Sequence, residues 1–190
     1  MFQRIKSDNS LAVKKAINIL NKGGVIIYPT DTIYGFGCNA NNHDAIKKIN
    51  SIKGRKGPMS VLAPNISTAL KWMNLSKKEK SIVEKKLGGD TTVIAPVKDD
   101  IVSGLITGRN QSLGIRIPDH AFCNELSFNY PHPITTTSVN RSGYEPFTIP
   151  DIIENEFSND IELLVDGGII NGIGSTIYIY EDEDWTILRS

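Results

Sequence analysis

The chain has 190 residues, of which 39% are hydrophobic and 22% are charged, a balance typical of a folded globular protein and not of a disordered one. Its 21 Lys and Arg residues equal its 21 Asp and Glu residues, so overall charge gives no case for a protein that coats nucleic acid. This length predicts one domain, residues 1–190, with a substantial core.

Helical and strand patterns alternate along the chain. Apolar spacing predicts helices over residues 10–22, 42–53, 67–73, 76–87, 119–128 and 148–157, with Ser10 as the N-cap of the first and a capping box from Ser76 to Glu79. Short apolar runs predict strands over residues 25–28, 59–63, 91–95, 113–117, 134–138, 162–165, 175–180 and 185–188. This alternation predicts an α/β or mixed α+β fold, a sheet covered by helices.

A polar segment follows the strand predicted at 25–28, in residues 29–37, PTDTIYGFG. Hydroxyls, a carboxylate and glycines at the end of a buried strand are typical of a small-ligand site in an α/β protein. The alternative is a strand that ends in an ordinary tight turn.

Three cations lie close together in residues 53–57, KGRKG, just after a predicted helix. Arg supplies a forked donor and Lys a point charge, so this turn could bind a polyphosphate. The alternative is a solvated helix C-terminus, where the helix dipole favours Lys and Arg. The spacing differs from that of a Walker A loop, and we expect the turn to be exposed when no ligand is bound.

Further polar clusters lie in residues 135–143 and 166–176. The hydroxyls, amide and glycine of residues 135–143 suit an anion or a ribose, although a Ser/Thr-rich edge strand would look the same. The glycines of residues 166–176 would let the backbone approach a ligand, or mark two ordinary loops. Arg116 lies in an apolar strand and needs an anionic or carbonyl partner if it is buried.

Several catalytic patterns are missing from the sequence: GxSxG, HExxH and GxGxxG after a strand. Cys38 and Cys123 form no CxxC pair and no metal cluster with the three His residues, so we expect buried structural thiols in a reduced, cytoplasmic protein. We find no signal-peptide core and no run long enough to span a membrane, and expect no membrane partner. The polar residues favour binding and positioning over covalent catalysis.

Taken together and in this order, these motifs resemble the YrdC family, the L-threonylcarbamoyl-AMP synthases. The resemblance covers nearly the whole chain, through residues 28–37, 53–55, 114–118, 137–143, 166–168, 174–176 and 187–189. It implies a twisted, open sheet of mixed parallel and antiparallel strands with a concave basic cavity. It also implies that L-threonine, bicarbonate and ATP, with Mg²⁺, condense to threonylcarbamoyl-AMP and pyrophosphate, after which a threonylcarbamoyl-transferase complex modifies tRNA.

The resemblance also implies site residues, and it assigns no metal ligand. It places the catalytic phosphate contacts at Lys53 and Arg55. The other nucleotide contacts are Ser138, Asn140, Ser142 and Arg189. The threonine and carbamate end is assigned to Thr30, Thr32, Tyr34, Arg116 and Ser175.

Two segments depart from the family pattern. Residues 58–64 lack the His that some members carry, and residues 87–92 read LGGDTT where the family shows PGPxT. One alternative function is an RNA-binding or ribosome-associated protein that uses basic faces at 53–56 and 77–86 to bind tRNA or double-stranded RNA. Glu79 and Glu84 within the second face, and the lack of an RNP-like aromatic motif, argue against it. Another is a paralogue that acts on a different small amine or acid.

Overall fold

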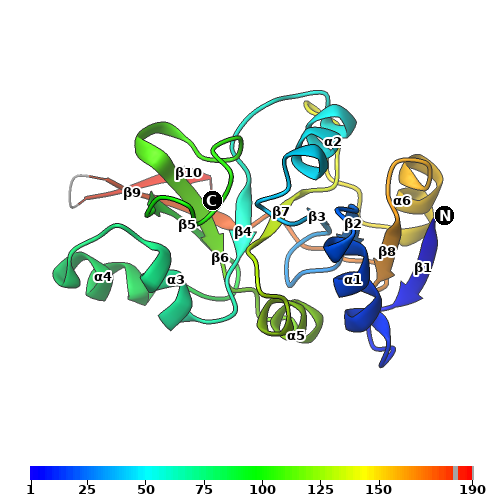
Figure 1. Ribbon diagram of the computed structural model, residues 1–190, viewed down its shortest axis with the longest axis horizontal. Helices are drawn as coiled ribbons and strands as arrows, with labels where there is room; N and C mark the ends of the chain where they lie inside the picture. Colours follow the sequence, from blue (N-terminus) through cyan, green and yellow to red (C-terminus); the bar gives the residue numbers. More distant parts are fainter. Residues whose placement is uncertain (182–183, 190) are drawn as a thin grey trace.

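A mixed sheet spans the computed structural model, which describes residues 1–181 and 184–189 (Figure 1). Within these residues ten strands pair in the order β1-β8-β2-β3-β7-β4-β6-β5-β9-β10. Their bounds are β1 Gln3–Lys6, β2 Ile26–Tyr28, β3 Gly35–Gly37, β4 Ser60–Leu62, β5 Thr91–Pro96, β6 Ser112–Arg116, β7 Ile134–Ser138, β8 Leu163–Asp166, β9 Thr176–Glu181 and β10 Asp184–Arg189. The pairs β1–β8, β8–β2, β4–β6 and β5–β9 are parallel and the others antiparallel, which confirms the mixed sheet.

Helices cover both faces of the sheet. Their bounds are α1 Ala12–Asn21, α2 His43–Lys53, α3 Ile66–Trp72, α4 Lys77–Val83, α5 Ala121–Asn129 and α6 Pro150–Phe157, with 3₁₀ turns η1 Glu84–Lys86 and η2 Arg109–Gln111. Side chains of β2 alternate between two cores: Ile26 and Tyr28 pack with α1 and α5, and Ile27 packs with α2 and α6. Figure 1 shows these two helix pairs on opposite sides of β2. Among the described residues, no helix has both the length and the apolar character that crossing a bilayer requires.

The expected helix over 42–53 and the expected capping box at Ser76 are both confirmed. Asn42 caps α2 by accepting a hydrogen bond from the Ala45 amide, and Gly54 ends the helix with a left-handed φ of 66°. The capping box of Ser76 and Glu79 is formed at the start of α4. However, α4 ends at Val83 and continues only as the 3₁₀ turn η1, so the expected helix over 76–87 is too long.

The expected cap at Ser10 is wrong. The N-cap of α1 is Leu11, without a side-chain cap bond, and Leu11 is 52% exposed instead of facing the core. The physical reason is the preceding turn, in which the Asn9 side chain accepts from the Leu11 amide at 2.9 Å and the Asn9 carbonyl accepts from Ala12 at 2.8 Å. This turn brings the chain into the helix one residue later than the Ser pattern indicates.

Strands β1 and β3 were not predicted from the sequence. Gly35 and Gly37 are typical of a turn, yet they are the first and last residues of β3, the hairpin partner of β2. A Cβ on Gly37 would lie 2.5 Å from Cε1 of Tyr28, so glycine here allows the Tyr28 ring to pack against the neighbouring strand. This hairpin places residues 29–34 as a loop at its end, which is where the site begins.

Candidate functional site

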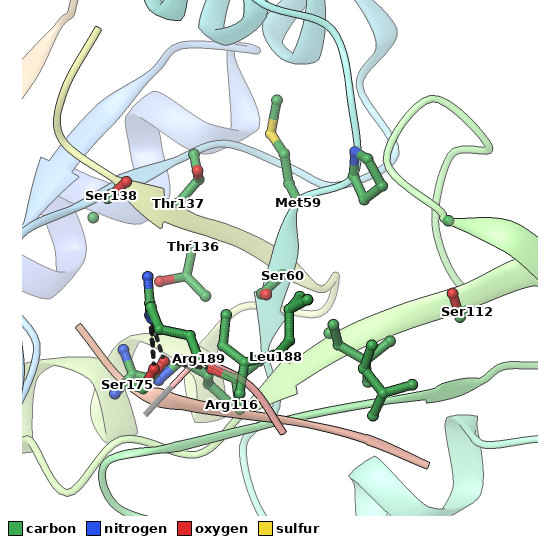
Figure 2. A pocket seen from close by; sticks show the side chains of 18 of the residues that line it. Met59, Ser60, Ser112, Arg116, Thr136, Thr137, Ser138, Ser175, Leu188 and Arg189 are labelled. Atoms are coloured by element: carbon green, nitrogen blue, oxygen red, sulfur yellow. Dashed lines mark hydrogen bonds between the residues drawn. The ribbon is translucent and has the colours of Figure 1, made fainter. Parts of the chain in front are cut away.

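A cavity of about 560 Å³ lies among β4, β5, β6, β7, β9 and β10 (Figure 2). Its size falls within the usual range of small-molecule sites. Figure 2 shows Ser60, Thr136, Ser138 and Ser112 from β4, β7 and β6 at its wall, with Arg116, Ser175, Leu188 and Arg189 gathered on another side. Hydroxyl groups and arginines thus face a common space.

The cavity lining favours an anionic ligand. Four arginines line it, Arg55, Arg109, Arg116 and Arg189, and Glu181 is the one acidic residue among its described lining residues. Arg116 is neutralised by Asp31, so the remaining excess of positive charge comes from the other three. Partly enclosed cations attract phosphate or carboxylate groups more strongly than cations in open water.

The loop at 29–34 is shaped by one hydroxyl group. Oγ1 of Thr30 donates to the Ile33 carbonyl at 2.7 Å and accepts from the Thr32 and Ile33 amides at 3.1 and 3.2 Å. Thr30 lines the cavity, whereas Thr32 lies behind it and its Oγ1 accepts from Nη1 of Arg116 at 3.1 Å. Thr30 therefore builds the turn that presents Tyr34 to the cavity.

Arg116 has the anionic partner expected of a buried arginine. Its Nη2 donates to Oδ1 of Asp31 at 2.7 Å, and the other oxygen of Asp31 accepts from the Asp119 amide at 2.9 Å. Arg116 is 5% exposed, and its Nε is buried without a hydrogen-bond partner among the described residues. A buried donor is costly to leave unpaired, so this atom favours a ligand or water oxygen beside it.

Lys53 is buried, contrary to the expectation of an exposed cationic turn, whereas Lys56 on the same turn is exposed and Arg55 is half-buried. Lys53 is 2% exposed, and its Nζ donates to the Ser138 carbonyl at 2.5 Å and to the carbonyl and Oδ1 of Asn140 at 3.1 and 2.7 Å. Burial, and secondly the charge of Arg55, lower the pKa of Lys53 to about 8. The last turn of α2 carries this side chain inward over the ring of Phe36. The ammonium group therefore bonds to Ser138 and Asn140 and does not line the cavity.

The segment after β7 is held by this lysine and its neighbours. Oγ of Ser138 donates to Oδ1 of Asn140 at 2.7 Å, and the amide of Ser142 donates to the Lys53 carbonyl at 2.8 Å. Arg141 donates to the Ile52 carbonyl and forms an ion pair with Glu156. Consequently Ser138 lines the cavity while Asn140 and Ser142 lie outside its lining.

On the opposite side, Arg189 grips the chain at Ser175 (Figure 2). Its Nε and Nη2 donate to the Ser175 carbonyl at 3.0 and 2.7 Å, and Oγ of Ser175 is 2.7 Å from Oγ1 of Thr92. Burial, and secondly the Arg116 charge, lower the pKa of Arg189. The two hydrogen bonds from Arg189 to the Ser175 carbonyl fix the plane of the guanidinium beside the cavity.

Tyr34 connects the cavity to the end of β8. Its hydroxyl donates to the Gly168 carbonyl at 2.7 Å and accepts from the Gly167 amide at 2.9 Å. Burial raises the pKa of Tyr34 to about 12, so the phenol stays protonated and keeps both bonds at neutral pH.

The structure brings together part of the set expected from the sequence. The cavity lining contains Thr30, Tyr34, Arg55, Arg116, Ser138, Ser175 and Arg189. The other expected residues lie outside the lining and form hydrogen bonds to the segments that carry it: Thr32, Lys53, Asn140 and Ser142. Sequence reasoning missed Arg109 and the apolar wall formed by Met59, Ile94, Ile177, Ile179 and Leu188. In a sequence, apolar strand residues that line a cavity look the same as apolar strand residues that pack in the core.

Comparisons with known proteins agree with this arrangement. The Sua5/YciO/YrdC family model, described as telomere recombination, matches residues 18–190. A threonylcarbamoyl-AMP synthase of Bacillus subtilis (strain 168) is 32% identical over 187 residues, 96% of this chain and 54% of that protein, so the chain spans about half the length of this relative. A threonylcarbamoyl-AMP synthase of Hydrogenovibrio crunogenus is 30% identical over 189 residues, 94% of this chain and 97% of that protein.

Solved structures give the same picture. P. abyssi Sua5 complexed with L-threonine matches all of this chain and 57% of its own, with a TM-score of 0.88 and 25% identity. E. coli YciO matches all of this chain and 96% of its own with a TM-score of 0.89, and at 22% identity this likeness supports the fold alone.

Proposed function

The chain belongs to the Sua5/YciO/YrdC family, and from this premise we propose that it is an L-threonylcarbamoyl-AMP synthase. It condenses L-threonine, bicarbonate and ATP to threonylcarbamoyl-AMP and pyrophosphate, acting as a nucleotidyltransferase. A threonylcarbamoyl-transferase complex then uses the product to modify tRNA. The observation that carries this proposal is the arginine- and hydroxyl-lined cavity, in a chain that matches the threonine-bound Sua5 along its whole length.

The reaction suits a site without a protein nucleophile. The amine of threonine and bicarbonate give a carbamate and water, and a carbamate oxygen then attacks the α-phosphorus of ATP as pyrophosphate leaves. This chemistry needs positioned reactants and neutralised phosphate charge. Burial raises the pKa of Cys38 to about 12, so its thiol is protonated at neutral pH and takes no part as a nucleophile.

The lining residues divide between the two substrates. Arg55, on the turn that follows α2, binds the phosphates, and Ser138 binds the nucleotide. Arg116 and Ser175, with the turn built by Thr30, form the threonine and carbamate end. Lys53 acts as a positioning residue, because its three hydrogen bonds hold the segment that carries Ser138 and Asn140.

Mg²⁺ fits this site only as a partner of the nucleotide. The described residues contain no group of three or more His, Cys, Asp or Glu side chains able to hold a metal ion. Mg²⁺ at ATP sites takes most of its ligands from phosphates and water, so a protein cage is not required. Glu181 is the carboxylate in the described lining that could contribute.

The test is pyrophosphate release from ATP, Mg²⁺ and bicarbonate with each amino acid in turn. We expect release to require L-threonine and bicarbonate together. A site built to hydrogen-bond a hydroxyl rejects an analogue without one by up to about 10⁴-fold, so alanine and valine should be poor substrates.

Two outcomes would contradict the proposal. Equal turnover with valine or alanine would show that the amino-acid substrate is not threonine. No release with any amino acid, together with salt-dependent affinity for tRNA, would favour the RNA-binding alternative.

A further inference from the structure

Arg4 lies in β1, before the segment 18–190 that the family model matches, yet it contacts the end of β8 directly. Its Nε and Nη2 donate to Oδ2 of Asp166 at 3.0 and 2.7 Å. Its Nη1 donates to Asp151 and Glu154 of α6, at 2.7 Å each. One guanidinium thus joins β1, α6 and the last residue of β8.

Asp166 also holds the glycine turn that follows it, Gly167–Gly168. It is 2% exposed, and its Oδ1 accepts from the Gly168 amide at 2.8 Å. Gly168 has a left-handed φ of 79°, and a Cβ on Gly167 would lie 2.6 Å from Cβ of Pro29. Both positions therefore require glycine, and the turn has little freedom once Asp166 is fixed.

The glycine turn contacts the cavity through Tyr34, whose hydroxyl binds both Gly167 and Gly168. Beyond the turn, the loop 167–175 packs against the cavity loop: a Cβ on Gly172 would lie 2.0 Å from the Thr32 carbonyl oxygen. The loop ends at Ser175, which lines the cavity. Two contacts, one at Tyr34 and one at Thr32, therefore couple the end of β8 to the threonine end of the cavity.

We propose that Arg4 is a positioning residue for the amino-acid end of the cavity, acting through Asp166 and the Gly167–Gly168 turn on Tyr34 and the loop 167–175. The identity of the amino acid rests on the proposed function, whereas the ordering of the loop does not. The planar guanidinium of Arg4 donates to the carboxylates of Asp166, Asp151 and Glu154 at the same time. A lysine at this position has a compact ammonium group and could not bond to all three in this geometry.

The variant Arg4→Met should keep the fold. Nζ of Lys6 also binds Oδ2 of Asp166, at 2.7 Å, so the buried carboxylate retains a cation. β1 is an edge strand of four residues, paired only with β8 among the described residues. The matched control is the double variant Asp151→Asn, Glu154→Gln, which removes the outer ion pairs of Arg4 and leaves its contact with Asp166.

Amide hydrogen exchange of the folded proteins tests the positioning without any assay of activity. We expect faster exchange across residues 167–175 in Arg4→Met and wild-type exchange in the control. Unchanged exchange in Arg4→Met would overturn the proposal. Faster exchange spread evenly over the whole sheet would also overturn it, because that result describes a general stabilising role.

Steady-state kinetics then separate the two substrates. We expect Arg4→Met to raise KM for L-threonine about ten- to a hundred-fold, the loss expected of one charge-assisted contact, with KM for ATP within two-fold. Arg4→Lys should recover only part of this loss. Equal increases in both KM values would overturn the assignment to the amino-acid end. If the wild type itself released no pyrophosphate while the exchange result held, the proposed function would fail and the positioning role would stand.

Discussion

Replacing Gly172 by Ala tests whether the path of the loop 167–175 sets the geometry of the cavity. The new Cβ would lie 2.0 Å from the Thr32 carbonyl oxygen, whereas ordinary contact begins at 3.4 Å, so the two segments must separate by the difference, about 1.4 Å. Thr32 cannot yield easily, because its amide binds Thr30 and its hydroxyl accepts from Arg116. The loop 167–175 therefore moves.

The size of the effect follows from that displacement. A misplacement of about 1 Å at a reaction site can cost about 10²-fold in rate, so we expect kcat/KM for L-threonine to fall by about that factor. Gly172 is exposed and outside the core, so the melting temperature should fall by only about 2–4 °C, the equivalent of about 1 kcal/mol in a chain of this size. Pyrophosphate release at varied threonine, together with a thermal melt, measures both quantities.

The matched control is Gly104→Ala, because no atom lies within 4 Å of the Cβ added there. It should retain wild-type turnover. If Gly172→Ala also had wild-type kcat/KM, the loop would not determine the geometry of the site, and the reasoning would be refuted.

Four further predictions follow from single contacts. Arg55→Ala should lower turnover by roughly 10²–10³-fold and weaken ATP binding in a calorimetric titration, with little change in melting temperature. The control is Lys56→Ala, at the adjacent exposed cation, and equal effects of the two variants would show that the turn is only a solvated helix end. Lys53→Met should speed amide exchange over residues 138–142, and lost ATP binding with unchanged exchange would instead indicate a direct phosphate contact. Replacing Cys38 and Cys123 by Ala should leave turnover within a few-fold, because burial raises the pKa of both thiols; complete loss in a folded variant would reopen covalent catalysis. Burial alone would raise the pKa of the Asp166 carboxyl group, but hydrogen bonds from Lys6, Gly168 and Arg4 lower it. The ionised carboxylate therefore stabilises the fold fully above about pH 4, and this stabilisation is lost as the pH falls through the folded-state pKa. The free energy of unfolding of the wild type should converge on that of Asp166→Asn in acid, and a constant difference between the two from pH 7 to 3 would contradict this.

The sequence was most informative where structure depends on neighbours in the chain. The caps of α2 and α4 involve residues three positions apart, so the helix start at residue 42 and the capping box at Ser76 could be predicted from residue type and spacing. β1 gave no such signal, because its four residues lack apolar alternation and its only described partner, β8, begins at residue 163. Pairing across that separation is decided by tertiary packing, which a local pattern does not contain.

The site was predictable in outline for a related reason. Polar residues at strand ends, such as Thr30 and Ser138, stand out against apolar strands, and they do line the cavity. The burial of Lys53 could not be foreseen, because a lysine at the end of a helix usually extends into solvent. Its acceptors, Ser138 at the end of β7 and Asn140 just after it, lie 85 and 87 residues further along the chain.

The polar motif residues therefore serve two different purposes, and the division explains how the cavity is held. Three loops approach the ligand space, and each is fixed by a side chain that binds main-chain groups. Thr30, which itself lines the cavity, holds residues 29–34, whereas Lys53 and Asp166 lie outside the lining and hold residues 138–142 and 167–175. Loops held in this way keep their geometry without substrate, which suits a reaction that depends on position and charge and not on a nucleophile. It follows that substitutions at Lys53 or Asp166 should change local exchange before they change ligand contacts, whereas substitutions at Arg55 or Arg116 should act on the ligand directly.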